Sequence, residues 1–148
     1  MKYINEIIIR VPREKVVELF ENPENVSKWQ PGFVSMELQS GEKGELGSKT
    51  LLKYKMGKRE VEMVETITEK RLPEIFSGTY ETKGVWNEVR NHFEELPDGS
   101  TRYWSENEFK MSGMMKVFAF LMPGAFKKQS QKYLELFKDF AEKEVGLN

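Results

Sequence analysis

Residues 92–109, HFEELPDGSTRYWSENEF, decide the fold that the sequence predicts. The tripeptide PDG at 97–99 suits a three-residue hairpin loop with glycine in the left-handed conformation. Such a loop pairs Phe93 with Tyr103, and this pair sets the register of the two flanking strands, which we expect at 84–96 and 101–112. One predicted hairpin therefore determines which side chains share a face of the sheet.

The register predicts a charged face on this hairpin. Glu94 faces Arg102 and Arg90 faces Glu106, and each opposite-charge pair is worth roughly a few tenths of a kcal/mol on an exposed face. A shift by one residue loses both pairs. The face as a whole carries too many charges to be buried, so it must contact water; it consists of Trp86, Glu88, Arg90, His92 and Glu94 against Arg102, Trp104, Glu106, Glu108 and Lys110.

The opposite face of the same hairpin mixes apolar side chains with amides and a hydroxyl. A polar group buried without a partner costs about 1–3 kcal/mol, which argues against a dry core. We favour a cavity that holds water or a ligand; the alternative is that the amides satisfy one another or the local backbone. The face consists of Val85, Asn87, Val89, Asn91 and Phe93 against Tyr103, Ser105, Asn107, Phe109 and Met111.

Five further strands precede the hairpin, at about 2–11, 33–39, 48–56, 59–69 and 74–82. Most connections are too short for crossover helices, so the sheet must be antiparallel. Alternation directs Leu52, Tyr54, Val61, Met63, Glu65 and Ile67 inward, with Glu65 as the acidic group inside. In the strand 74–82 the face is ambiguous, and we prefer Phe76, Gly78 and Tyr80 inward.

Helices are predicted in two places. Two short ones lie between the first two strands, in PREKVVELF (12–20) and PENVSKW (23–29), because apolar residues recur there at helical spacing. A helix of about 20 residues, about 30 Å long, follows Gly124. Its apolar stripe consists of Phe126, Ser130, Tyr133, Phe137, Phe140 and Ala141. Pro123 should separate this helix from the apolar segment before it. We favour 114–126 as a core element; the alternative is an apolar lid beside the mouth of a cavity.

Composition narrows the function classes. At 148 residues the chain suits one domain, residues 1–148. The positive charges of Lys plus Arg (23) and the negative charges of Asp plus Glu (24) nearly cancel, so we expect no long-range positive field and no nucleic-acid partner. The chain has no cysteine, which removes disulfides and thiolate chemistry. Its start does not resemble a signal peptide and no segment reaches membrane-spanning length, so we expect a cytoplasmic protein without a membrane span.

Familiar catalytic motifs are absent from the sequence. GELGSKT (44–50) departs from the phosphate-binding loop, because its lysine follows a serine and a strand comes where a helix should begin. His92 is the single histidine, and the register directs it outward. We therefore predict no histidine triad, no metal site and no cofactor.

These elements together resemble the START/Bet v 1-like (SRPBCC) helix-grip superfamily, and within it the polyketide cyclase/dehydrase-like branch. The resemblance covers essentially the whole chain and rests on the Trp29-x-Pro31 turn, the link GEKGELGSK (41–49) and the hairpin 92–109. It implies an α+β helix-grip fold, in which a curved antiparallel sheet of about seven strands wraps around the long C-terminal helix and leaves a cavity. Trp29 and Pro31 then either close one end of that cavity or plug the core.

Two functions of different classes follow, and we favour the first. It is the binding of a small hydrophobic or amphiphilic ligand, such as a lipid, isoprenoid or polyketide, by a carrier or sensor. The predicted cavity residues are Trp29, Leu52, Tyr54, Met63, Glu65, Phe76, Tyr80, Asn87, Val89, Asn91, Phe93, Tyr103, Ser105, Asn107, Phe109, Phe126, Ser130, Tyr133 and Phe137. The second is a cyclase or dehydratase-like enzyme with Glu65, Tyr54 or Tyr103 as general acid or base.

A third function is suggested by other members of the superfamily. It is a co-chaperone-like protein-interaction module with the outward Trp86 and Trp104 as anchors, since large apolar side chains on a surface mark interaction sites. A homodimer contact through the same two residues is an equal alternative.

Overall fold

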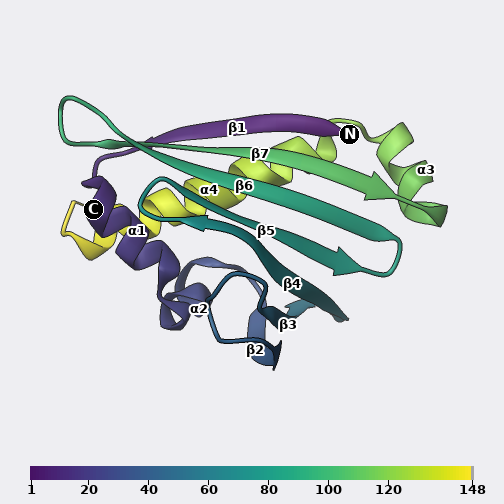
Figure 1. Ribbon diagram of the computed structural model, residues 1–148. Helices are drawn as coiled ribbons and strands as arrows, with labels where there is room; N and C mark the ends of the chain where they lie inside the picture. Colours follow the sequence, from purple (N-terminus) through teal and green to yellow (C-terminus); the bar gives the residue numbers. More distant parts are fainter. Residues whose placement is uncertain (148) are drawn as a thin grey trace.

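The computed structural model describes residues 1–147 and contains one seven-stranded sheet in the order β1-β7-β6-β5-β4-β3-β2 (Figure 1). Every neighbouring pair is antiparallel, as predicted from the short connections. The strands are β1 (Lys2–Ile9), β2 (Phe33–Ser40), β3 (Lys49–Met56), β4 (Arg59–Arg71), β5 (Ile75–Thr82), β6 (Val85–Glu95) and β7 (Thr101–Met111).

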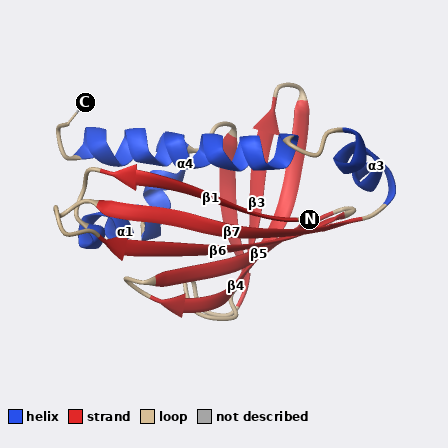
Figure 2. Cartoon of the chain, turned by 90° about the horizontal axis from the view of Figure 1, so that it is seen from above, coloured by secondary structure: helices blue, strands red, loops and turns tan. Residues whose placement is uncertain are grey.

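Helices lie at both ends of the sheet and across one of its faces. α1 (Arg13–Glu21), the single-turn η1 (Pro23–Asn25) and α2 (Val26–Trp29) connect β1 to β2, while α3 (Gly113–Leu121) and α4 (Ala125–Glu144) follow β7. Figure 2 shows α4 crossing the sheet, with α1 near one end and α3 at the other. The predicted break at Pro123 is confirmed, because α3 ends before it and α4 begins after it.

The hairpin that sets the register forms as predicted. Phe93 is paired with Tyr103. The Gly99 N–H donates to the Leu96 carbonyl at 3.0 Å, and Gly99 has φ 87°, a conformation that glycine adopts without steric cost. The Leu96 N–H in turn donates to the Ser100 carbonyl at 2.9 Å, which closes the three-residue loop.

The outer face of this hairpin carries the expected charges with one rearrangement. Arg102 lies 3.3 Å from Glu94, as predicted. Arg90 is opposite Glu106 in the register, but its guanidinium pairs with Glu88 on the same strand at 3.2 Å. Glu106 instead hydrogen-bonds with His92 at 2.8 Å. The register therefore sets which residues are neighbours, while side-chain rotamers decide which of them pair.

The two outward tryptophans are half-buried, which corrects the expectation that they are exposed. The ring of Trp104 stacks on His92 with a centroid distance of 3.7 Å. The ammonium of Lys110 lies 4.7 Å from the centre of the Trp86 ring. Cation–π contacts and stacking cover much of both rings, and a partner surface at Trp86 and Trp104 stays a prediction.

Helix α4 is fixed along the edge strand β1 by polar contacts. The Tyr3 hydroxyl lies 2.6 Å from the Ser130 hydroxyl, and the Asn5 amide donates to the Lys127 carbonyl at 3.1 Å. At the other end of α4, the Glu142 carboxylate accepts the Arg10 backbone N–H at 2.9 Å. Burial alone would raise the pKa of Glu142, but hydrogen bonds from Arg10 and the ammonium of Lys138 outweigh it and lower the pKa to about 2.

The hydrophobic core lies at the end of the sheet where α1 and α2 pack. The Phe20 ring contacts Phe93 and Phe137 edge-on, at centroid distances of 5.2 and 5.6 Å. The Trp29 ring contacts Phe137 in the same way at 5.1 Å, so Trp29 belongs to this core cluster. Trp29 was expected either to close one end of a cavity or to fill the core, and the structure favours the second alternative.

The turn after Trp29 depends on a glycine. Gly32 has φ 76°, and a Cβ on it would collide with the Lys55 carbonyl oxygen. The Gly32 carbonyl accepts the Lys55 N–H at 2.7 Å. Proline and glycine at 31 and 32 therefore allow the chain to leave α2 and join β3 at close backbone distance.

Two remaining expectations can be resolved. The preferred inward face of β5 is confirmed, because the Phe76 ring packs on Phe20 at 5.9 Å and the Tyr80 hydroxyl bonds to inward-facing Glu65. The favoured interpretation of 114–126 as a core element is wrong, since α3 contains no buried residue and Phe120 is 85 % exposed. Within residues 1–147, no helix has both the length and the hydropathy that crossing a bilayer requires.

Candidate functional site

The inner face of the sheet divides into two halves that differ in solvent access. Near α1 and α2 the inward side chains are closed off: Phe137 is 0 %, Phe93 2 % and Tyr103 4 % exposed. We call the inward side chains that are buried or belong to the core cluster the closed half, with Asn107, opposite Tyr3 and Val89, at its border. Of the predicted cavity residues it contains Trp29, Leu52, Tyr54, Phe76, Asn91, Phe93, Tyr103, Ser105, Asn107 and Phe137.

Toward α3, the inward side chains remain half-buried although they lie under α4. We call this part the open half; it consists of Tyr3, Val61, Met63, Glu65, Tyr80, Val85, Asn87, Val89, Phe109, Met111, Phe126, Ser130 and Tyr133. Most of these side chains are apolar, and solvent reaches all of them. The same strands β6 and β7 therefore supply both a sealed core and an accessible wall.

A carboxyl–phenol pair lies in the open half. Glu65 and Tyr80 are direct cross-strand partners, and the Tyr80 hydroxyl donates to Glu65 Oε2 at 2.7 Å. Burial raises the pKa of Glu65, and the hydrogen bond from Tyr80 opposes this rise only in part. Burial and the Glu65 charge both raise the pKa of Tyr80 well above its ordinary value. Both side chains are half-buried on the inner face, and their burial is the main cause of both pKa shifts.

The other two candidate acid–base groups belong to the closed half. The Tyr103 hydroxyl donates to Asn91 Oδ1 at 2.7 Å, and burial raises its pKa. The Tyr54 hydroxyl donates to Gln30 Oε1 at 2.5 Å, and burial, followed by Tyr133 and Glu65, raises its pKa. Both phenols therefore act as neutral donors within the core, and of the three candidates only Glu65 lies in the open half.

The inner amides are largely engaged with one another. Asn107 donates to the Ser105 hydroxyl at 3.3 Å, and its own carbonyl accepts from Asn87 at 3.5 Å. Asn91 accepts from Tyr103. For Asn91, Ser105 and Asn107 the structure favours mutual satisfaction over a wet cavity. What distinguishes the open half is therefore the access to its apolar side chains.

Sequence reasoning left Tyr3 out of the site. The Tyr3 ring stacks on Phe109 with a centroid distance of 6.0 Å, and its hydroxyl contacts Ser130 on α4. The alternation of Tyr3, Asn5, Ile7 and Ile9 along the first strand was the signal that could have found it. Tyr3 joins the edge strand, β7 and α4 at the open half.

An aromatic series connects the open half with α3. The Phe109 ring contacts Phe126 at a centroid distance of 5.0 Å, and Phe126 contacts Phe118 of α3 at 5.8 Å. Phe118 is 44 % exposed, whereas Phe126 is half-buried. The open half therefore ends at a helix whose apolar side chains face outward.

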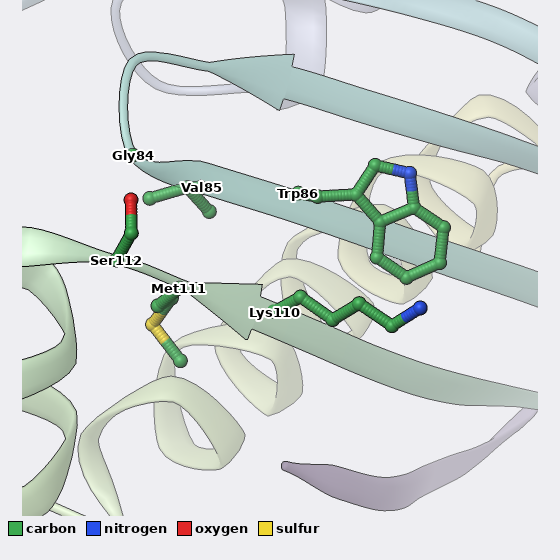
Figure 3. A pocket seen from close by; sticks show the side chains of 6 residues that line it. All are labelled: Gly84, Val85, Trp86, Lys110, Met111 and Ser112. Atoms are coloured by element: carbon green, nitrogen blue, oxygen red, sulfur yellow. The ribbon is translucent and has the colours of Figure 1, made fainter.

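Two surface cavities border this inner face and share the open-half residues Tyr3, Val85 and Met111 with it. One, of about 310 Å³, lies beside α3, where Trp86 and Lys110 are side by side on adjacent strands (Figure 3); it is lined by Gly84, Val85, Trp86, Lys110, Met111 and Ser112. The other, of about 740 Å³, lies along the β1 edge and is lined by Lys2, Tyr3, Ile4, Glu88, Arg90, Glu106, Asn107, Glu108 and Lys127. Its lysines and glutamates are typical of a solvated surface, so we assign the candidate site to the open half.

The described part of the chain, residues 1–147, has no cluster of His, Asp or Glu arranged to hold a metal ion.

Comparison with known structures supports the fold. The chain is similar to the crystal structure of Ara h 8.0201 (TM-score 0.75, 14 % identity, covering 97 % of this chain and 98 % of that one). It is also similar to a conserved protein from Geobacillus kaustophilus (TM-score 0.80, 16 % identity, 97 % and 96 % covered). A third similar structure is the Zhui aromatase/cyclase from Streptomyces sp. R1128 (TM-score 0.79, 12 % identity, 98 % and 95 % covered).

At these low identities the structural similarity establishes the helix-grip fold alone, and the search of curated proteins found no match. The family model described as "Polyketide cyclase / dehydrase and lipid transport" matches residues 2–142, which is nearly the whole chain. This chain therefore belongs to the polyketide cyclase/dehydrase and lipid transport family, within the Bet v 1-like helix-grip fold.

Proposed function

We propose that this protein binds a small hydrophobic or amphiphilic molecule in the open half, as a carrier or sensor. The ligand class is a lipid, an isoprenoid or a polyketide-like aromatic. The observation that carries the proposal is that inward, mostly apolar side chains stay half-accessible beneath α4. Exposed apolar surface costs free energy in water, and an apolar ligand that covers it recovers that free energy.

The composition of the open half suits an amphiphile. Val61, Met63, Val89 and Phe109 supply apolar contact, and methionine adapts to ligands of different shape. Glu65 with its bonded Tyr80 supplies a polar group in the same half. In the proposed complex the apolar body of the ligand lies along β6 and β7, and its polar end meets Glu65 and Tyr80.

Dye binding tests this proposal directly. Anilinonaphthalene sulfonate, which fluoresces in apolar sites, is titrated into the native protein and into Val89→Phe, which fills part of the open half. Val34→Phe on β2, where the native side chain is 59 % exposed, is the matched control. We expect binding to the native protein and to the control, and its loss in Val89→Phe. Equal binding by all three, or no binding by the native protein, contradicts the proposal.

A second candidate function is favoured by the Glu65–Tyr80 pair. A carboxyl group whose pKa is raised by burial holds its proton nearer to neutral pH, as a general acid or base requires. In this proposal Glu65 transfers a proton on a carbonyl substrate of the polyketide type, and Tyr80 orients the carboxyl group.

The enzymatic candidate is tested with a short poly-β-ketone thioester as substrate. Glu65→Gln keeps the shape of the side chain and removes its titration, so we expect loss of any cyclisation or dehydration that the native protein catalyses. Glu62→Gln on the same strand, where the native side chain is exposed, is the control. Full turnover by Glu65→Gln removes this role.

A further inference from the structure

Helix α3 exposes an unusual amount of apolar surface. All of its residues except Gly113 and Lys116 are apolar. Met114 is 80 %, Phe120 85 % and Leu121 68 % exposed, while Phe118 and Met115 lean toward the body of the protein. A contiguous patch of this kind on a protein surface marks a place where something apolar docks.

The chain around α3 is basic over a long stretch. Between Glu108 and Glu135 it has no Asp or Glu, and its charged residues are Lys110, Lys116, Lys127, Lys128 and Lys132. Lys83 lies in the turn next to Gly84, whose carbonyl accepts the Ser112 N–H at 3.0 Å just before α3. We call Lys83, Lys110, Lys116, Lys127 and Lys128 the basic collar; all five side chains are exposed.

Acidic residues lie beside part of this field: Glu88, Glu106 and Glu108 line the β1-edge cavity together with Lys127. Glu81 is opposite Trp86 in the sheet register, and Glu108 lies 3.7 Å from Lys2. The whole chain has a formal charge of −1, so the positive charge at α3 is a local concentration. Lys116 lies within α3, and Lys110, Lys127 and Lys128 flank the helix in the sequence.

Trp86 adds an amphipathic aromatic residue at the edge of this surface. It lines the cavity beside α3 with Lys110, whose ammonium lies over its ring (Figure 3). Tryptophan and lysine side by side suit the boundary between lipid headgroups and acyl chains, where an aromatic ring is half-immersed and an ammonium meets phosphates.

We propose that the α3 end docks on the surface of an anionic lipid bilayer. Met114, Val117, Phe120 and Leu121 enter the boundary between headgroups and acyl chains, and the basic collar contacts the anionic headgroups. A helix of nine residues, about 14 Å long, suits insertion parallel to the surface.

Charge complementarity selects this partner over a second copy of the chain. A two-fold contact through α3 would bring two basic collars together, and like charges in one interface are unfavourable. An anionic membrane offers the opposite charge and an apolar layer beneath it.

Docking through α3 would bring the adjoining open half close to the membrane. Phe118 and Phe126 lead from α3 to Phe109, so a lipid-soluble ligand could pass between the bilayer and the open half without crossing water. This purpose rests on the proposed binding function; membrane docking itself does not.

Vesicle flotation without added ligand tests the proposal. The native protein is mixed with vesicles of phosphatidylcholine alone, or with one third phosphatidylserine, at about 0.1 M and about 1 M sodium chloride, where the Debye length falls from about 10 to about 3 Å. We expect flotation with the phosphatidylserine vesicles at low salt, and a clear loss on neutral vesicles or at high salt.

Two double variants separate the apolar and electrostatic contributions. Phe120→Ser with Leu121→Ser removes inserted side chains, and Lys116→Glu with Lys128→Glu reverses part of the collar. Each should weaken binding to the anionic vesicles about tenfold or more. Lys43→Glu with Lys143→Glu makes the same change of net charge at exposed positions outside the collar and should bind like the native protein.

Several outcomes would overturn the docking proposal. These are no flotation of the native protein, equal flotation on neutral vesicles, or an equal loss in the collar variant and its charge-matched control. A stable dimer in solution that dissociates in Phe120→Ser with Leu121→Ser would assign α3 to self-association instead. Because no ligand is added, each of these results leaves the dye-binding test of the open half unchanged.

Discussion

The closed and open halves of the inner face are built from the same strands with the same alternation, yet one is a core and the other an accessible wall. Phe93 and Val89 both point inward from β6, but Phe93 is 2 % exposed and Val89 is half-buried. The difference lies in what covers them. At Phe93, residues of α1, α2 and the C-terminal part of α4 meet, as the contacts of Phe20, Trp29 and Phe137 show.

Helix α4 repeats this contrast along its own length. Phe137 and Ala141 are 0 % exposed, whereas Tyr133, one turn earlier, is half-buried. The apolar stripe of α4 therefore packs against the buried core at its C-terminal end and against the solvent-accessible open half nearer its N-terminal end. Stability should depend mainly on the closed half, and ligand affinity mainly on the open half.

The largest effect should come from truncation on α4. Phe137→Ala leaves a cavity in the closed core and should lower the free energy of unfolding by about 3–5 kcal/mol. Tyr133→Ala should cost clearly less, because its side chain is only partly buried in the native protein. Urea unfolding of both variants measures the difference, and equal losses would break the distinction between the halves.

The second largest loss of stability should come from removing the Glu142 charge, which connects α4 to Arg10 just after the end of β1. Glu142→Gln removes a buried charge that accepts from Arg10 and Lys138, and should cost about 1–3 kcal/mol. The folded pKa of about 2 is below the ordinary 4.5, so this stabilisation is present above about pH 4.5 and is lost as the pH falls toward 2. Unfolding from pH 7 to 2 should show a smaller acid-dependent loss in Glu142→Gln than in the native protein.

The same substitution, tyrosine to phenylalanine, can be made in each half of the inner face. Tyr103→Phe leaves the buried Asn91 carbonyl without its donor and should cost about 1–3 kcal/mol. Tyr80→Phe should cost less, since water can reach the Glu65 carboxyl group.

Tyr80→Phe should also change a titration. Its hydrogen bond lowers the pKa of Glu65, so its removal should raise that pKa further. Carboxyl carbon chemical shifts measured across pH report it. An unchanged or lower pKa in Tyr80→Phe would show that the pair does not control the Glu65 charge.

The smallest effect on stability is expected at α3. Phe120 is 85 % exposed, so Phe120→Ser should change the free energy of unfolding by no more than about 0.5 kcal/mol. Urea unfolding measures this change, and the same experiment on Phe137→Ala supplies the contrast. A loss above about 2 kcal/mol would show that α3 is packed in solution.

Much of the fold was predictable because local rules were strong. The PDG loop and the alternation around it predicted the pairing of Phe93 with Tyr103, and the structure has that register. The break at Pro123 and a helix of 20 residues after Gly124 also followed from proline chemistry and apolar periodicity. The inward direction of Glu65 required only the alternation of a strand, whereas that of Tyr80 was a preference in an ambiguous strand, which its hydrogen bond to Glu65 confirms.

The favoured interpretation of 114–126 failed for a physical reason. Hydropathy predicts burial of MMKVFAFLM, but burial needs a surface to pack against, and at this end of the sheet α3 packs on Phe126 and the Gly84 turn without burying any of its residues. Likewise, a sequence cannot show that Asn107 bonds to Ser105 and Asn87, because rotamers and neighbouring strands decide those contacts.

The sequence by itself determined the approximate strands, the register of the hairpin 92–109 and its two faces, because these depend on alternation and on turn residues near in the chain. Only the tertiary structure decided which inward side chains became core. That outcome depends on where α1, α2 and α4, distant in sequence, cover the sheet, and on where they leave it accessible.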